Sequence, residues 1–361
     1  MAPLWILLLP ALAGALAYHQ APAWTWAALL ALHGAGAGLL GLPVLAALAW
    51  TLAAGAGLAA WPAARRRLLA APLLPLLRRA LPPLSATERE ALEAGDTDWE
   101  AAFFTGRPDF QALLDRGPPA LSPRERAYLE GPVAELCAAL DDWRITHHDL
   151  DLPPEAWALI RRHRLFGMII PEAYGGLGFS ALAHGAVVAR LASRSIAGAV
   201  TVMVPNSLGP AELLLRYGSE AQRREHLPRL ARGEAVPCFA LTGPTAGSDA
   251  AAIPDRGVVC RGTWEGREVV GVRLDWNKRY ITLAPVATLL GVAFRLEDPE
   301  GLLGPPGERG ITLALVPAGT PGVEQGRRHL PLNCPFQNGP TTGRGVFLPL
   351  EALVGGAEGA G

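Results

Sequence analysis

Charge is missing from the first part of this chain. Between Met1 and Ala64 there is no Asp, Glu, Lys or Arg, although the 361 residues together carry 32 basic and 33 acidic side chains. The sequence therefore consists of an apolar beginning and an ordinary soluble remainder. The net charge of −1 leaves no basic surplus, which argues against a nucleic-acid partner.

Lysine and cysteine are scarce as well. Lys278 is the only lysine, which indicates a strong preference for arginine in the coding sequence. The cysteines lie far apart and form no CxxC pair, so they suit neither a metal centre nor a disulfide framework. We interpret them as buried or incidental thiols in a reducing compartment and expect no metal site. They are Cys137, Cys238, Cys260 and Cys334.

The apolar beginning is long enough to cross a membrane. Residues 4–18 form a short apolar stretch, and residues 23–61 continue for 39 residues without a charge. A helix crosses a hydrocarbon core of about 30 Å with about 20 residues. The longer stretch therefore predicts two spans with a bend at Gly41-Leu42-Pro43, and the shorter one a third span or an interfacial segment. A cleaved signal peptide is the rival interpretation, but residues 1–3 lack the basic side chain that it needs.

Arginines follow this transmembrane segment, which we place at residues 1–64. Arg65, Arg66 and Arg67 come first, and Arg78 and Arg79 come a little later. Arginine near the end of a span marks the cytoplasmic side. Residues 65–84 also mix leucine with arginine, as a helix on an anionic membrane surface does. We expect a basic interfacial linker here and a globular region that faces the cytoplasm.

One motif in the apolar stretch is misleading. Residues 36–41 fit GxGxxG, but a dinucleotide fingerprint needs a strand before it and an acidic residue about 20 positions later. This run lies among uncharged apolar residues. Close packing of helices through small residues is the better interpretation.

The soluble remainder predicts an α+β fold. Capping-box patterns at Ser85 and Ser122 begin an all-helical domain at residues 85–232, with Gly218 and Gly233 as helix stops. From residue 233 to about 350, short strands separated by Gly, Pro and Asp turns predict a small antiparallel barrel or sandwich. The helices are expected up to Leu140 and over 154–164, 181–197 and 210–232, and the strands over 236–241, 257–261, 269–274, 279–283, 288–296 and 311–316.

Three segments of the globular region suit a planar ligand. Residues 171–180 are rich in glycine and lead into a helix, and residues 239–249 form a strand that runs into a loop of small residues. Such loops let backbone N–H groups approach a ligand closely. On the segment 277–282, Tyr280 and Thr282 are two positions apart and share one face of a strand. A turn, a loop crossing and an amphipathic strand remain the ordinary alternatives.

These segments, in this order and spacing, resemble the acyl-CoA dehydrogenase family. In detail the chain is similar to the large membrane-associated bacterial FadE-type enzymes of fatty-acid β-oxidation, through residues 204–209, 276–287 and 329–340 and the apolar beginning. The resemblance covers essentially the whole chain. It implies a helical domain, a β domain and a second helical bundle, with FAD between the last two. It also implies a location at the bacterial inner membrane.

The resemblance implies roles for six residues. FAD would be contacted by the strand of Phe239 and Leu241, by the hydroxyl of Thr242, and by Tyr280, which stands where most relatives have tryptophan. Ser248 matches a serine near the FAD pyrophosphate and the substrate's pantetheine arm, and Thr282 the hydroxyl that bonds flavin N5. Two positions depart from the family pattern: Gly243 replaces a common glutamate, and Leu283 a common asparagine.

The implied reaction is the α,β-dehydrogenation of a medium- or long-chain fatty acyl-CoA to a trans-2-enoyl-CoA, with electron-transferring flavoprotein as electron acceptor. The family's catalytic base is a glutamate on the second helical bundle. No residue up to Gly361 matches its motif, and residues 351–361 match only the start of the crossover to that bundle. Neither Glu172 nor Glu351 is expected to replace it. We therefore expect no catalytic base here, and a fragment inactive by itself that forms a homo-oligomer at full length.

Two alternatives stay open at this point. The chain is also consistent with a non-catalytic, membrane-anchored protein that binds acyl-CoA or a partner. A third interpretation is a flavin enzyme whose helical bundle comes from a separate chain.

Overall fold

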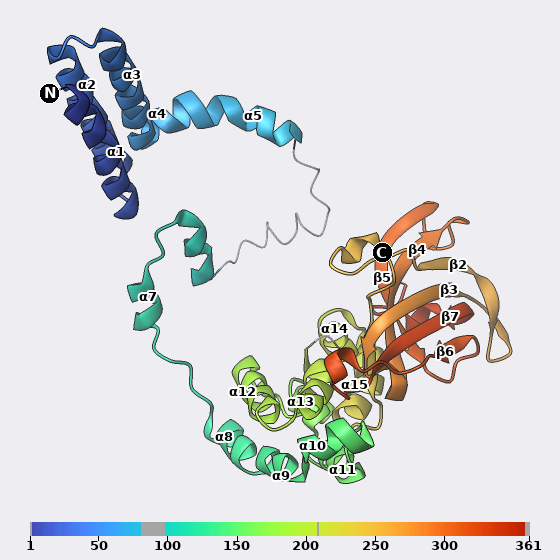
Figure 1. Ribbon diagram of the computed structural model, residues 1–361. Helices are drawn as coiled ribbons and strands as arrows, with labels where there is room; N and C mark the ends of the chain where they lie inside the picture. Colours follow the sequence, from blue (N-terminus) through green and yellow to red (C-terminus); the bar gives the residue numbers. More distant parts are fainter. Residues whose placement is uncertain (1, 81–97, 208, 358–361) are drawn as a thin grey trace. The chain divides into compact units, whose positions relative to one another are not determined.

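The computed structural model describes residues 2–80, 98–207 and 209–357 (Figure 1). The chain divides into two compact units, Met1–Leu113 and Leu114–Gly361. The predicted capping box at Ser85 lies outside the described residues, as does Leu208.

The first unit consists of helices. The predicted bend is confirmed, because Gly41 has a φ of +70° and a new helix begins at Pro43. Among the described residues, α3 is the one helix that is long and apolar enough to cross a membrane by length and composition. The helices are α1 (Ala2–Tyr18), α2 (Ala23–Leu39), α3 (Pro43–Ala60), α4 (Pro62–Arg65) and α5 (Ala71–Ala80), with a π-helical stretch at Arg66–Ala70, a 3₁₀ turn at Trp99–Thr105 and α7 (Phe110–Asp115).

Small residues bring α2 and α3 together. Ala37 of α2 is fully buried. A Cβ atom added at Gly34 would lie 3.0 Å from the Trp50 ring of α3, so the two helices approach too closely there for a larger side chain. The GxGxxG run begins inside α2, with no strand before it. Within the run, the buried Ala37 supports the predicted role in helix packing, whereas Gly38 and Gly41 have open space around them.

Helices open the second unit. At Ser122 the predicted capping box is formed: the serine hydroxyl accepts from the Glu125 N–H, and the glutamate accepts from the Ser122 N–H. The single helix predicted over 181–197 is two helices, because the Ser195 side chain caps a second one. The helices are α8 (Pro123–Glu130), α9 (Pro132–Ala139), α10 (Asp142–Arg144), α11 (Pro154–Arg162), α12 (Ala181–Ala192), α13 (Ile196–Met203), α14 (Pro210–Tyr217) and α15 (Glu220–Ala231).

A seven-stranded sheet follows, in the order β1-β4-β2-β3-β7-β6 with β5 on β4. In Figure 1 the helices of this unit lie together on one side of the sheet. The sheet and the helices share one hydrophobic core, which includes Leu136 and Phe166 from the helices and Phe294 from β4. The strands are β1 (Pro237–Ala240), β2 (Arg256–Trp264), β3 (Arg267–Thr282), β4 (Leu289–Asp298), β5 (Gly307–Pro317), β6 (Val323–Gln325) and β7 (Asn338–Pro349).

The sheet differs from the predicted antiparallel arrangement. Both β1 and β2 pair with β4 in parallel, and they share one edge of it. The remaining pairs are antiparallel. This mixed order arises because the β2–β3 hairpin lies between β1 and β4 in sequence, so that the chain returns to β4 by a crossover.

Candidate functional site

The ends of β1 and β3 meet at a junction that we call the β1–β3 junction, formed by Leu241 and Thr242 after β1 and by Lys278 and Arg279 of β3. The Arg279 N–H donates to the Thr242 carbonyl over 2.9 Å. One residue back on each segment, Lys278 Nζ donates to the Leu241 carbonyl over 2.8 Å. Two adjacent hydrogen bonds therefore join the two segments that were singled out in the sequence.

Just beyond this junction, β3 carries Tyr280 and Thr282. The pairing of β3 with β7 is irregular between Lys278 and Ile281, and Tyr280 has a φ of +59°. Ile281 is buried, whereas Tyr280 is 61% exposed and Thr282 is half-buried. The bulge thus turns the tyrosine ring outward beside the threonine hydroxyl, as bulges near functional sites commonly do.

Asn338, the first residue of β7, connects these two residues. Its amide nitrogen donates to the Tyr280 carbonyl over 3.1 Å and to Thr282 Oγ1 over 3.3 Å. Since the threonine oxygen accepts here, its own hydrogen is free to point elsewhere. The ring of His329 lies 5.5 Å from that of Tyr280.

Polar atoms without a partner gather around Tyr280 and Thr282. Asn338 Oδ1 and His329 Nδ1 are buried and make no hydrogen bond within the described residues. Such atoms are costly unless a ligand or water satisfies them. Their position beside an exposed ring and an available hydroxyl is what a binding site for a flat, polar-edged ligand requires.

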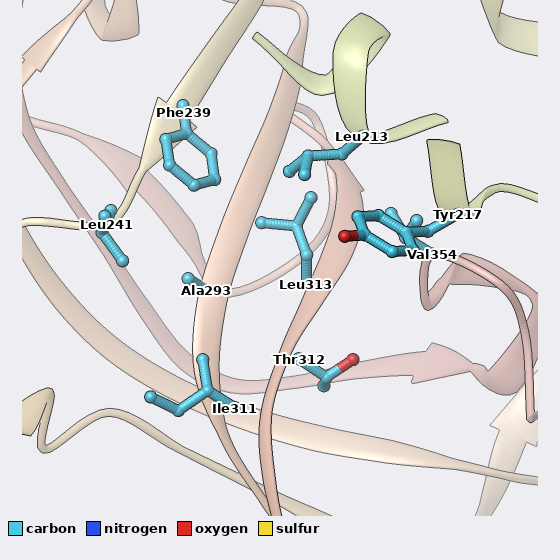
Figure 2. A pocket seen from close by; sticks show the side chains of 9 residues that line it. All are labelled: Leu213, Tyr217, Phe239, Leu241, Ala293, Ile311, Thr312, Leu313 and Val354. Atoms are coloured by element: carbon cyan, nitrogen blue, oxygen red, sulfur yellow. The ribbon is translucent and has the colours of Figure 1, made fainter. Parts of the chain in front are cut away.

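Leu241 also lines an apolar groove of about 450 Å³. Figure 2 shows Phe239 and Leu241 on one side of it, and Leu213 and Tyr217 from α14 on the other. Its floor is formed by β4 and β5. The lining residues are Leu213, Tyr217, Phe239, Leu241, Ala293, Ile311, Thr312, Leu313 and Val354.

Of the six predicted residues, five lie on the two joined segments. Phe239, Leu241 and Thr242 belong to β1 and its continuation, and Tyr280 and Thr282 to β3. Ser248 is exposed on the loop after Thr242. That loop turns back at once, because the Gly243 N–H donates to the Ala246 carbonyl over 2.9 Å.

Carboxylates near the junction are already engaged. Asp255 Oδ1 accepts from the Asn277 N–H over 2.7 Å, and Oδ2 accepts from Lys278 Nζ over 2.5 Å. Glu172 pairs with Arg124 on the helical side. Glu351 lies on a short 3₁₀ turn after β7, where its backbone carbonyl, rather than its carboxylate, accepts from Gln222. Cys238 is also unsuited to chemistry, because burial raises the pKa of its thiol to about 12.

The Gly-rich segment 171–180 lies against α15, and its Tyr174 packs on the same apolar cluster as Phe239 and Leu241. Its backbone pairs with the residues just before it, for example from the Leu177 N–H to the Gly167 carbonyl over 2.9 Å. Gly176 is required there, since a Cβ atom would lie 2.0 Å from the Ile170 carbonyl oxygen. These contacts give the segment a packing role, and none of those known for the described residues joins it to Tyr280.

Sequence reasoning missed Asp255, Asn338 and His329. The first is 23 positions from its partner Lys278, and the other two lie on a Gly- and Pro-rich stretch without strand alternation. The usable signals were the isolated lysine in an arginine-rich chain and the resemblance of residues 329–340 to the family, neither of which gave these residues a role.

Two family models match this chain: the acyl-CoA dehydrogenase N-terminal domain at residues 126–234 and the middle domain at residues 238–336. The probable acyl-CoA dehydrogenase FadE10 of Mycobacterium tuberculosis is 30% identical over 275 residues, which are 73% of this chain and 40% of that protein. Protein HemX of Proteus mirabilis is 51% identical over 69 residues, 19% of this chain and 41% of that protein, and this short match carries no argument about function.

Solved structures agree on the fold. Butyryl-CoA dehydrogenase from Megasphaera elsdenii superposes with a TM-score of 0.57 at 23% identity, over 67% of this chain and 61% of that one. An acyl-CoA dehydrogenase from Bacillus anthracis, complexed with FAD, superposes with a TM-score of 0.56 at 21% identity. The match covers 67% of this chain and 40% of that one. The chain spans less than half the length of the curated relatives that it matches.

Proposed function

The chain belongs to the acyl-CoA dehydrogenase family, and from that premise we propose that it binds FAD at the β1–β3 junction and serves the α,β-dehydrogenation of a medium- or long-chain fatty acyl-CoA. Bound FAD would supply the hydride acceptor of that reaction. The observation that carries the proposal is the joining of Leu241-Thr242 to the bulge where the Tyr280 ring and the Thr282 hydroxyl become accessible.

The residues at the junction fit a flavin. The Tyr280 ring offers a stacking surface. The Thr282 hydroxyl, which accepts from Asn338, can donate its hydrogen to a ring nitrogen. The unpartnered Asn338 Oδ1 offers an acceptor nearby. Ser248, on the exposed loop, is assigned to the pyrophosphate and to the pantetheine arm of the substrate.

The described residues offer no free carboxylate at the junction. Asp255 is the acid nearest to it in the hydrogen-bond network, and both of its oxygens are engaged. A base must be within hydrogen-bond reach of the proton that it removes. We therefore expect these 361 residues to bind FAD and acyl-CoA without completing the reaction. We expect the protein to act as a homo-oligomer in which reduced flavin would pass electrons to an electron-transferring flavoprotein.

FAD binding is tested by titrating the purified chain, in detergent, with FAD and following the quenching of flavin fluorescence. Thr282→Val should weaken binding about tenfold, because one hydrogen bond worth about 1 to 1.5 kcal/mol is lost. The control is Tyr217→Ala, which removes an exposed tyrosine from the groove. It should change the Kd for FAD less than twofold. Absence of saturable binding by the wild-type chain would refute the proposal.

A second titration tests the missing base. Palmitoyl-CoA added anaerobically to the FAD-loaded chain should leave the flavin absorbance unchanged. Bleaching of the flavin would show that a base is present after all and that the chain completes the first half-reaction.

We also propose that the first unit anchors the protein in a bacterial inner membrane, with residues 114–361 in the cytoplasm. The packed helices α2 and α3 support this, as does the arginine cluster that begins at Arg65. On α5, Leu73, Leu76 and Leu77 are exposed beside arginines, which suits the surface of an anionic membrane. The chain should resist carbonate extraction from membranes, and a variant without residues 1–64 should not. Protease should reach residues 114–361 in inverted vesicles only.

The groove beside Leu241 favours a second candidate function, the non-catalytic binding of acyl-CoA or a partner. Its lining is apolar apart from Tyr217 and Thr312, and a volume of about 450 Å³ suits a small apolar ligand. Leu313→Arg should then abolish the binding of a fluorescent acyl-CoA but leave FAD binding unchanged. If acyl-CoA still binds the Leu313→Arg variant, the groove is not its site.

A further inference from the structure

The one lysine of this chain lies in the core. Lys278 stands among 32 lysine and arginine residues, and its side chain is 0% exposed. On β3 it continues the buried face of Val272, Leu274 and Trp276, where an apolar residue is the normal occupant. A chain that uses arginine almost everywhere else has a compact ammonium group at this one position.

The ammonium group joins three segments. It pairs with Asp255, whose side chain is 2% exposed and which lies just before β2. It also donates to the Leu241 carbonyl after β1. Asp255 in turn accepts the Asn277 N–H of β3 through its second oxygen. The β1 end, the β2 start and β3 are thus connected through one buried ion pair.

Stability alone does not account for this pair. Burial lowers the pKa of Lys278, and the neighbouring Asp255 opposes that shift. A buried ion pair generally contributes no more stability than apolar residues of the same size, although removing one partner is strongly destabilising. What apolar residues would not reproduce is the direction of the bond from Nζ to the Leu241 carbonyl.

We propose that Lys278 and Asp255 are positioning residues, which hold the Leu241-Thr242 backbone at a fixed spacing from Tyr280 and Thr282 so that both segments meet one planar aromatic ligand. The inference rests on the proposed function in assigning flavin as that ligand. The bond next to it, from Arg279 N–H to the Thr242 carbonyl, reports the spacing directly. Beyond this bond the backbone enters the left-handed conformation of Tyr280, which an unsupported non-glycine residue rarely adopts.

The test compares single and double variants of the full chain in detergent. Lys278→Met leaves Asp255 unpaired and should lower the thermal midpoint most. Lys278→Met with Asp255→Asn removes both charges, keeps an acceptor for the Asn277 N–H, and should regain at least half of that loss. The control is Arg256→Met with Glu297→Gln, which removes a solvent-exposed pair of the same sheet.

Hydrogen exchange of the Arg279 amide and FAD affinity provide the decisive readouts. In the double variant we expect about tenfold faster exchange and an FAD Kd about tenfold weaker, equivalent to one lost hydrogen bond. The control should keep both values within twofold of wild type. If the double variant matches wild type in both, the pair is merely structural and the inference is wrong.

Two further outcomes keep the inference separate from the proposed function. If the wild-type chain does not bind FAD, the proposed function fails, and exchange at Arg279 still decides whether the pair fixes the spacing. If neither variant folds, hydrogen exchange in the wild-type chain decides whether the pair fixes the spacing. Arg279 and Asn277 should then exchange no faster than Val292 in the centre of β4, and faster exchange overturns the inference.

Discussion

Asn206 provides a test of the fold that does not depend on any ligand. Its side chain is 3% exposed and makes four hydrogen bonds. Oδ1 accepts from the N–H groups of Met168 and Ile169 over 2.8 and 3.3 Å. Nδ2 donates to the carbonyls of Leu165 and Val202 over 2.6 and 2.9 Å. One amide thus joins the end of α13 to the segment that precedes the Gly-rich loop.

Asn206→Ala should be severely destabilising. It leaves at least two buried backbone groups, the Met168 N–H and the Leu165 carbonyl, without their side-chain partner. Each orphaned group costs about 1 to 3 kcal/mol, so the expected loss is roughly 3 kcal/mol. In a unit of about this size that loss corresponds to a fall in Tm of roughly 6 to 12 °C.

The assay is thermal unfolding followed by near-UV circular dichroism, with urea unfolding as a second measure. Ser207→Ala is the matched control, since the neighbouring Ser207 is exposed and its hydroxyl donates to the Met203 carbonyl of its own helix turn. It should change the free energy of unfolding by less than about 0.5 kcal/mol. A loss below about 1 kcal/mol in Asn206→Ala would refute the reasoning, because it would mean that water or backbone shifts satisfy the freed groups.

Three further predictions concern other parts of the second unit. Gly176→Ala should open the loop 171–180 to protease, because its Cβ atom would collide with the Ile170 carbonyl; Gly185→Ala, with open space around it, should not. Glu125 has its pKa lowered from 4.5 to about 2 by hydrogen bonds from Ser180 and Ser122. Its stabilising effect is therefore complete above pH 4.5 and lost as the pH falls toward 2, and in acid titrations followed by circular dichroism Glu125→Gln should lose that part of the pH dependence. Cys238, with a pKa of about 12, should resist iodoacetamide at pH 8 in the folded chain and react after denaturation, as peptide mass spectrometry would show.

Local signals in the sequence predicted local structure well. The Ser122 capping box needs only neighbouring residues, and the helix break at Pro43 needs only a glycine and a proline. Strands were harder to predict where contacts with distant parts of the chain determine their bounds. The prediction placed two strands, at 269–274 and 279–283, where β3 is one strand, because the apolar pattern is interrupted by polar residues, the last of them Lys278. Its partner Asp255 is on another segment, so the sequence offered no reason to bury it.

In the candidate site, too, some residues could be predicted from local sequence and others could not. The short motifs around Thr242 and Tyr280 could be found by pattern, and the structure shows that hydrogen bonds join them. Asn338 belongs to the stretch 329–340 that carries the resemblance, but no role could be assigned to it, because β7 is rich in glycine and pairs with β3 across a long loop. The bulge at Tyr280 was also invisible, since a positive φ at a tyrosine has no sequence signal.

The network around Asp255 bears on whether this acid could serve as the base of the proposed site. A carboxylate that is to remove a proton must be accessible to the substrate and free to accept. Asp255 is neither, since its side chain is 2% exposed and both oxygens are bound to groups of β3. Freeing it would require breaking the ion pair with Lys278, which in turn would release the Leu241 carbonyl and disturb the spacing to Tyr280. In the proposed site, the same contacts that would hold the ligand therefore disqualify its nearest acid as a base.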